Sequence, residues 1–264
     1  MGLWSQANSL TLNGLKTKMM LFSTAQLGRK HNLGSVPLEV SVNNFAIERV
    51  ECNKLLGIHF TQHLKWGEHV KNTTASCYAT IAVLRKLKHL APYNLRKTLS
   101  ESLVRSKLDY GDTVFCPLSN VDLKRLQKCQ NVAGSFVLGK YVKDRENLKK
   151  IGWLSMKERR DLHLLQQTFK AIHFANWPQY LSLEQSSDDR NLRSQGNIRL
   201  NVPLENRTFQ DNASKLFNSL PIHIRNCKDF NTFSKLVKQF LTEQMLYNFI
   251  NLLYYGRGWD ILIY

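Results

Sequence analysis

The spacing of apolar residues along the chain changes near residue 66. Before that point, short stretches alternate between apolar and polar positions, which is typical of strands with one buried face. The predicted strands cover residues 18–23, 38–42, 45–50 and 55–60. Asn43-Asn44 is a turn signal between two of them, and Gly57 predicts a bulge inside the last. Residues 4–12 predict a short helix ahead of the strands.

Beyond residue 66, apolar residues recur every three to four positions, which predicts amphipathic helices. The apolar stripes are Val70, Cys77, Tyr78, Ile81 and Leu84; Leu95, Leu99 and Leu103 in a helix over 92–108; Leu123, Leu126, Ala133 and Val137; Leu162, Leu165, Phe169 and Ile172; and Phe230, Phe233, Val237 and Phe240. Gly139 follows the third stripe as an expected helix end, and Asp229 or Asn226 is expected to cap the last helix.

These patterns predict an α+β fold with a small antiparallel β segment followed by a mostly α-helical region. The expected regions are residues 1–65, a β-rich part ending in a hairpin; 66–183, a helical domain; 184–207, a linker or loop rich in Ser, Asp, Asn and Arg; 208–253, a C-terminal helical segment; and 254–264, a tail that matches no pattern.

The charge of the chain narrows the choice of partner. Its 264 residues include 37 Lys and Arg but only 20 Asp and Glu, a formal net charge of +17. Such an excess favours a polyanionic partner, above all nucleic acid. We find no run of about 18 apolar residues, so no membrane-spanning helix is expected. We expect an intracellular protein, in the nucleus or the cytoplasm, with no small-molecule substrate.

Basic residues lie opposite the apolar stripes of three successive predicted helices. They are Lys71, Arg85, Lys86, Lys88 and His89; Arg96, Lys97, Arg105 and Lys107; and Lys124, Arg125 and Lys128. Any one group is an ordinary solvated helix surface. Three in succession with few acids to balance them favour a surface that contacts phosphates.

The sequence predicts no metal site. The five cysteines are widely spaced and form no C-x-x-C pair, and His59 and His63 have no carboxylate between them as metalloprotease helices do. Asp188-Asp189 lies in a polar stretch that predicts a solvated loop rather than a rigid catalytic hairpin. Asp109 and Asp112 flank Tyr110-Gly111 near a predicted helix end. They are expected to be solvated, although a pair at this spacing binds a cation weakly.

Six motif blocks carry a family resemblance. They are Trp4, Asn8, Leu12-Asn13 and Lys16-Thr17; Lys54 to Phe60 with Leu64, Trp66 and His69; Ser106, Leu108 and Tyr110-Gly111; Leu126-Gln127, Gln130-Asn131 and Ala133; Gly152-Trp153-Leu154 with Arg159-Arg160; and Arg207 to Phe209, Ala213, Phe217-Asn218, Leu220-Pro221 and Ile224-Arg225. In this order and spacing, over residues 3–241, the blocks resemble the C-terminal part of non-LTR (LINE-type, jockey-like) retrotransposon reverse transcriptases. Phe217 stands where that family usually has Trp.

The resemblance implies the end of a palm, a primer grip and a thumb of an RNA-directed DNA polymerase, with an RNA–DNA or DNA duplex and element RNA as partners. The family's metal-binding aspartates precede the matched region, so this chain is expected to hold no cofactor, whereas the parent polymerase uses magnesium. The resemblance also marks Lys16 as a vestigial acid for the leaving group, and Leu56 and Gly57 as primer-grip residues. We therefore expect this chain to be inactive alone.

Two other interpretations remain open. The chain is also consistent with a non-functional relic whose exposed strand edges favour aggregation. The third interpretation is a helical module that binds a protein through residues 92–175, which would bind its partner independently of salt.

Overall fold

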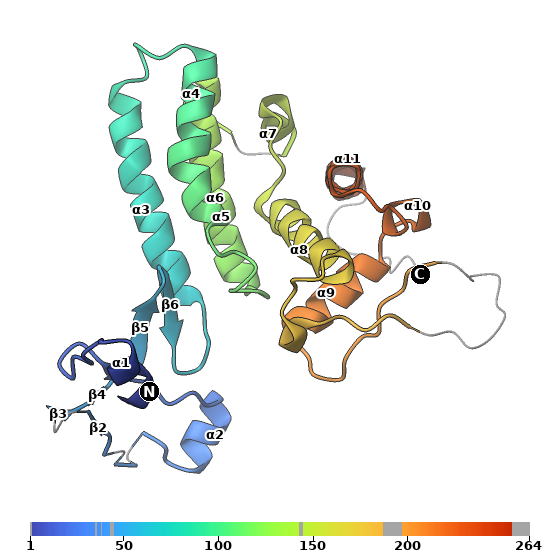
Figure 1. The fold of residues 1–264 in the computed structure, drawn as a ribbon. Coiled ribbons are helices and arrows are strands. Elements are labelled where there is room, and N and C mark those ends of the chain that lie inside the picture. Colours follow the sequence, from blue (N-terminus) through green and yellow to red (C-terminus); the bar gives the residue numbers. More distant parts are fainter. Residues whose placement is uncertain are drawn as a thin grey trace. The chain divides into compact units, whose positions relative to one another are not determined.

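The computed structural model is 54% helix and 8% strand, which confirms the predicted α+β class. The structure describes residues 2–254 apart from 35, 38, 43–44, 143–144 and 187–196. The chain forms two compact units, residues 1–72 and 73–264, and the boundary falls inside helix α3 (Gly67–Lys86) (Figure 1). Each unit is described by itself below.

Unit 1 consists of short elements. They are α1 (Gly2–Ala7), β1 (Lys18–Met19), α2 (Ala25–Lys30), β2 (Ser41–Val42), β3 (Phe45–Ala46), β4 (Glu48–Arg49), β5 (Cys52–Leu55) and β6 (Ile58–Thr61). The strands form three separate pairs: β1 with β4 is parallel, whereas β2 with β3 and β5 with β6 are antiparallel. The predicted helix over 4–12 ends at Ala7, and the predicted strands are shorter than expected. Asn43-Asn44 lies outside the described residues.

The prediction of one strand over 55–60 was wrong, because the chain reverses there. Leu55 pairs with Ile58 at the closed end of the β5–β6 hairpin, and Leu56 and Gly57 form its turn. Both turn residues have positive φ, 47° and 87°. Two residues with positive φ match the right-handed twist of the flanking strands, so a two-residue turn replaces the expected bulge.

Unit 1 buries little apolar surface. Among its described residues, the buried apolar side chains are those of Ile58 and Val70. Trp4, Leu15 and Phe45 are instead 66%, 76% and 53% exposed. Two-stranded sheets are marginally stable without a covering layer. Unit 1 therefore has strand pairing and turns but almost no core of its own.

Unit 2 is helical. After α3 come α4 (Tyr93–Ser100), the π-helical turn η1 (Glu101–Arg105), α5 (Ser106–Asp109), α6 (Asn120–Leu138), α7 (Arg145–Ile151), α8 (Met156–His173), the 3-10 turn η2 (Gln179–Leu181), α9 (Phe209–Asn218), α10 (Ile222–Arg225) and α11 (Phe230–Tyr254). Ser119 and Thr208 cap α6 and α9. Gly139 ends α6 in the left-handed conformation (φ 73°), as predicted, and Asp229 accepts the Thr232 N–H at the start of α11.

The apolar stripe that was predicted to be the buried face of the helix over 92–108 faces outward instead. Leu95 is 46% and Leu103 44% exposed, whereas Val104 and Leu108 are fully buried. The π-helical turn follows Ser100, and Arg105 within it is held against Trp153. This anchor fixes which face of the helix is buried, and apolar spacing alone does not reveal it. In α3 the predicted stripe is buried except for Tyr78, which is 41% exposed.

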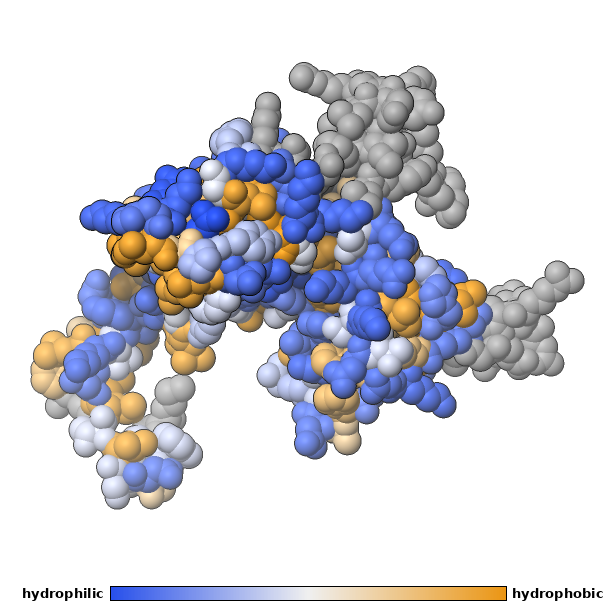
Figure 2. All heavy atoms as spheres, turned by 90° about the horizontal axis from the view of Figure 1, so that it is seen from above, coloured by the Kyte–Doolittle hydropathy of each residue, from blue (hydrophilic) through white to orange (hydrophobic). Residues whose placement is uncertain are grey.

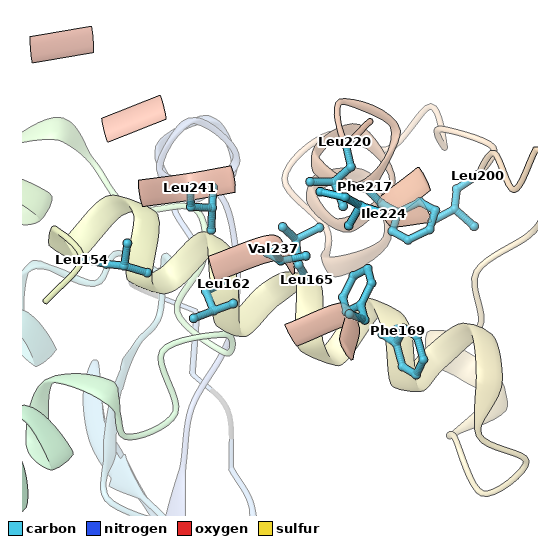
Figure 3. Close-up of a cluster of buried hydrophobic side chains, with 11 residues drawn as sticks. Leu154, Leu162, Leu165, Phe169, Leu200, Phe217, Leu220, Ile224, Val237 and Leu241 are labelled. Atoms are coloured by element: carbon cyan, nitrogen blue, oxygen red, sulfur yellow. The ribbon is translucent and has the colours of Figure 1, made fainter. Parts of the chain in front are cut away.

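The main core of unit 2 joins three helices that are distant in sequence. Leu165 and Phe169 of α8, Phe217 of α9, and Phe233 and Val237 of α11 are each at most 1% exposed. Figure 3 shows the side chains of α8 directed at those of α9 and α11. The predicted linker contributes Leu200, which pairs with Gln185 in an isolated bridge, and its residues 187–196 lie outside the described part.

The cysteines are free thiols in different surroundings. Cys77 of α3 and Cys129 of α6 are fully buried, and the Cys77 thiol also donates to the Val104 carbonyl (3.7 Å). A hydrogen bond to Cys77, together with burial, raises the pKa of the Cys129 thiol. Cys52 on the β5–β6 hairpin is exposed. In the part of the chain described here, every helix is too short or too polar to cross a bilayer.

Candidate nucleic-acid interface and the buried motif network

Residues from several motif blocks meet in one polar network inside unit 2, here called the motif network. At its centre the guanidinium of Arg159 (α8) forms a two-pronged ion pair with the carboxylate of Asp109 at the end of α5. Both side chains are about four-fifths buried, at 21% and 18% exposed. Paired, hydrogen-bonded charges are the form in which such groups tolerate burial.

Trp153 is bonded to the π-helical turn that precedes α5. Its indole N–H donates to Glu101 Oε1 (2.8 Å), which also accepts from Arg105 Nη1 (3.1 Å). The Arg105 guanidinium lies 4.5 Å from the centre of the Trp153 ring, a cation–π contact. Burial, followed by the nearby positive charge of Arg159, lowers the pKa of Arg105 to about 10. Arg105 therefore remains charged at neutral pH.

Arg160 holds the loop that follows α5. It is 7% exposed, and its Nη2 donates to the carbonyls of Asp112 (2.7 Å) and Phe115 (2.9 Å). Its guanidinium also lies 4.5 Å from the Phe115 ring centre. His163 Nδ1 lies 2.6 Å from the Asp112 carboxylate. Adjacent arginines of α8 thus fasten both ends of the Asp109–Phe115 segment.

The glutamines of α6 complete the network. Gln130 donates to the Leu154 carbonyl (2.9 Å), and Gln127 accepts from the Met156 backbone N–H (2.8 Å) while donating to Asn131 (2.8 Å). These bonds satisfy backbone groups where the chain enters α8. Gly152 has φ 78°, which glycine adopts without strain, and it lets the chain turn there.

The predicted pair Asp109 and Asp112 is therefore not solvated. Ligand atoms of Asp109, Asp112 and His163 lie within 4.8 Å of one another, so their spacing resembles a cation site. Arg159 already neutralises Asp109, and His163 bonds to Asp112. The Arg159–Asp109 ion pair joins α5 to α8. A cation bound at Asp109 would have to displace Arg159.

Three of the predicted phosphate-binding residues meet at the ends of α6 and α7. Lys88 donates to the Gly139 carbonyl (3.3 Å), and Arg96 Nη1 lies 3.4 Å from where a Cβ on Gly139 would be. Lys97 Nζ lies 4.0 Å from the equivalent point on Gly152. Helix C-termini carry partial negative charge. Part of the positive charge of these three residues thus stabilises the fold.

Arg85 and Lys86 differ from these three. Both are exposed in the last turn of α3, and neither has an ion-pair partner among the described residues. They lie in a 32-residue stretch, 69–100, that holds six Lys or Arg and no Asp or Glu. Figure 2 looks onto the α3–α4 turn and shows hydrophilic and apolar atoms side by side there. We call Arg85, Lys86, Lys88, Arg96 and Lys97 the basic end.

The remaining predicted phosphate contacts lie elsewhere. Lys124 and Lys128 are exposed on α6, 15 and 11 residues before Gly139, and so about 16–22 Å from the basic end along the helix. Arg125 pairs with Asp122 (3.1 Å). Lys71 belongs to unit 1 and lies 3.8 Å from Glu68. The predicted residues therefore do not form one cluster.

No protein-family model, curated protein or solved structure matches the chain.

The sites expected from the family resemblance in unit 1 are surface positions. Lys16 is exposed in a turn and is separated by eight residues from the end of α1, so it does not lie at a helix end. Leu56 is 82% exposed at the tip of the β5–β6 hairpin, beside Gly57. A large apolar side chain held outward at a positive φ is unusual, and such strain often accompanies contact with a ligand.

Sequence reasoning missed three further lysines near the basic end. Lys140 follows Gly139 directly, and Lys149 and Lys150 precede Gly152 by two or three residues. Their neighbours in the chain are the glycines that Lys88, Arg96 and Lys97 approach. The Lys149-Lys150 doublet was the available signal, but no apolar stripe marked α7 as a helix.

A cavity of about 480 Å³ opens beside the motif network. The loop after α5 lines it together with Asp161 and Leu164 of α8 and Lys215 of α9. Burial raises the pKa of Asp161 to about 6, although Lys157 and Arg160 act in the opposite direction. The charge of Asp161 therefore changes at a pH slightly below neutral.

Proposed function

We propose that this chain is the C-terminal, template–primer-binding part of a non-LTR retrotransposon reverse transcriptase, and that it does not polymerise alone. The observation that carries the nucleic-acid part is the basic end. An acid-free stretch of 32 residues folds into the α3–α4 hairpin and presents Arg85 and Lys86 without ion-pair partners among the described residues. Unpaired cations of this kind bind phosphates by releasing counterions.

The motif network supports the family part of the proposal. Blocks that resemble the family at residues 106–111, 126–133 and 152–160 are separate in sequence but bond to one another inside unit 2. These bonds join α5 and α6 to the start of α8. In the proposed parent enzyme, magnesium and its aspartates come from the region preceding this resemblance.

Charge reversal at the basic end tests the proposal. We expect Arg85→Glu/Lys86→Glu to bind an RNA–DNA hybrid at least about tenfold more weakly at physiological salt, and to lower the salt slope by about 2. The measurement is fluorescence anisotropy with a labelled hybrid over a salt series. These residues suit the test because, unlike Lys88, they have no bond to a helix end.

Lys235→Glu/Lys238→Glu is the matched control, because both lysines are exposed on α11 and the charge change is equal. If the control loses as much affinity as the test variant, net charge rather than the basic end governs binding. If the folded wild type does not bind the hybrid at all, the nucleic-acid proposal is wrong.

A protein-binding module is the second candidate, favoured by the exposed leucines of α4 and η1. Leu95 and Leu103 lie outward with the less exposed Leu99 between them in sequence, which gives the helix an apolar face that is about half exposed in the described part of the chain. A protein partner bound there would be insensitive to salt and lost in Leu95→Asp/Leu103→Asp. The hybrid affinity would remain unchanged in that variant.

A further inference from the structure

Aromatic side chains that the core does not use follow the end of α8. Phe174 is 50% and Tyr180 81% exposed. They lie in a stretch, 162–183, that contains no Asp or Glu. Exposed rings in an acid-free segment of a basic chain combine the two features with which proteins hold unpaired bases.

The first ring is held by the core beneath it. Phe174 lies 6.5 Å from Phe230 between ring centres, and Phe230 lies 5.7 Å from the buried Phe169, which Figure 3 labels. Lys170 Nζ lies 5.5 Å from the centre of the Phe230 ring. The exposed face of Phe174 is therefore supported by packed rings rather than by a mobile tail.

The second ring is held through its backbone. Trp177 donates its indole N–H to the Leu181 carbonyl (2.8 Å) and lies 5.7 Å from Phe209. Gln210 donates to the Tyr180 carbonyl (3.0 Å). These contacts fix η2 against α9 and leave the Tyr180 ring in solvent. A backbone ordered before binding lowers the entropy that is lost when a base stacks on the ring.

Positive charge lies near the first of these rings. Lys170 lies over Phe230, and Lys228 lies close enough to His173 to lower its pKa, although burial is the larger cause. The lowered pKa keeps His173 neutral at neutral pH. Its ring packs at a tilt against that of Phe169, with 4.3 Å between the ring centres. Asp229, next to Lys228, has its carboxylate engaged as the cap of α11, where it accepts the Thr232 N–H (2.7 Å). The acid nearest to Tyr180 in sequence is the exposed Glu184.

We propose that Phe174 and Tyr180, with Lys170 and Lys228, form an aromatic platform that stacks the bases of single-stranded nucleic acid. The inference rests on the proposed function, and it adds an unpaired strand as partner. A duplex hides its base faces, whereas every unpaired base offers one, so the platform tolerates any sequence. The two lysines supply the phosphate contacts.

Binding of a labelled single-stranded RNA of about 12 nucleotides tests the platform. Phe174→Ala and Tyr180→Ala should each weaken binding about 5- to 100-fold, because one stacked base is lost. The salt slope and the affinity for an RNA–DNA hybrid should not change. Phe174→Leu should bind as weakly as Phe174→Ala, because it keeps apolar volume but lacks the ring, whereas Tyr180→Phe should bind like the wild type. Tyr141→Ala is the control, since Tyr141 is 79% exposed in another segment.

The outcomes separate the two proposals. A wild type that binds both probes, with Phe174→Ala and Tyr180→Ala binding the single strand equally well, overturns the platform and leaves the proposed function intact. A loss of affinity in Tyr141→Ala of the same size overturns it as well. A folded wild type that binds neither probe overturns the proposed function and the platform together.

Discussion

The residues that the family resemblance marks most clearly are buried, and they act on the fold. Arg159, Arg160 and Trp153 lie inside the motif network, where they lock the loop after α5 and the π-helical turn. The bonds that the structure gives them are made to other residues of the chain. The residues that are accessible to a partner are exposed Lys, Arg and aromatic side chains, and no sequence motif distinguishes them.

The raised pKa of Asp161 predicts that the stability of the fold depends on pH. Burial raises its pKa to about 6 in the folded chain, above the value of about 3.9 in an unfolded one. The folded state therefore binds more protons between these values, and stability falls as pH rises from about 4 to about 6. The free energy of unfolding of Asp161→Asn should exceed that of the wild type by about 1–3 kcal/mol at pH 7, and the difference should be small near pH 4. Urea unfolding across this pH range measures the difference.

Glu184→Gln provides the control, because it removes one exposed negative charge without removing a buried one. A gain in Asp161→Asn that is the same at every pH would contradict the assigned cause.

At the scale of elements, the sequence predicted most helices and misplaced details that depend on tertiary contacts. The stripes of α6, α8 and α11 are buried or half-buried, and Gly139 and Asp229 end and begin their helices as predicted. The orientation of α4 was wrong because Arg105 and Trp153 decide it, 48 residues apart in sequence. Cross-chain anchors of this kind leave no local periodicity. Likewise, the sequence identified candidate basic residues. Which of them lie close together depends on the positions of the C-terminal ends of α6 and α7, and the sequence does not give these.

The turn of the β5–β6 hairpin predicts that a substitution at Leu56 will stabilise the hairpin. Leu56 has φ 47°, which asparagine tolerates better, and Asn-Gly is the preferred pair for such a turn. Leu56→Asn should stabilise the hairpin by about 1 kcal/mol and slow amide exchange at Asn53 and Phe60 about fivefold. Leu15→Asn, at another exposed leucine, should leave this exchange unchanged. Faster exchange in Leu56→Asn would show that the side chain supports the turn.

At the scale of the whole molecule, the two units differ in how much apolar surface they bury. Unit 2 has a continuous core across α8, α9 and α11, whereas unit 1 exposes Trp4, Leu15 and Phe45. We expect two unfolding transitions in urea, with unit 1 opening first. Hydrogen exchange should be fast throughout residues 2–72 and slowest in α6 and α8. One cooperative transition with uniform protection would refute this division.

The cysteines of the two units differ in how quickly a thiol reagent can reach them. Cys52 is exposed on the hairpin, whereas Cys77 and Cys129 face each other where α3 meets α6. A thiol reagent modifies the first as soon as it is added, and reaches the other two only when those helices separate. Mass spectrometry of the modified chain thus dates the separation of α3 and α6 in unit 2, with Cys52 as an internal reference that reacts at once, and needs no dye, tag or engineered residue.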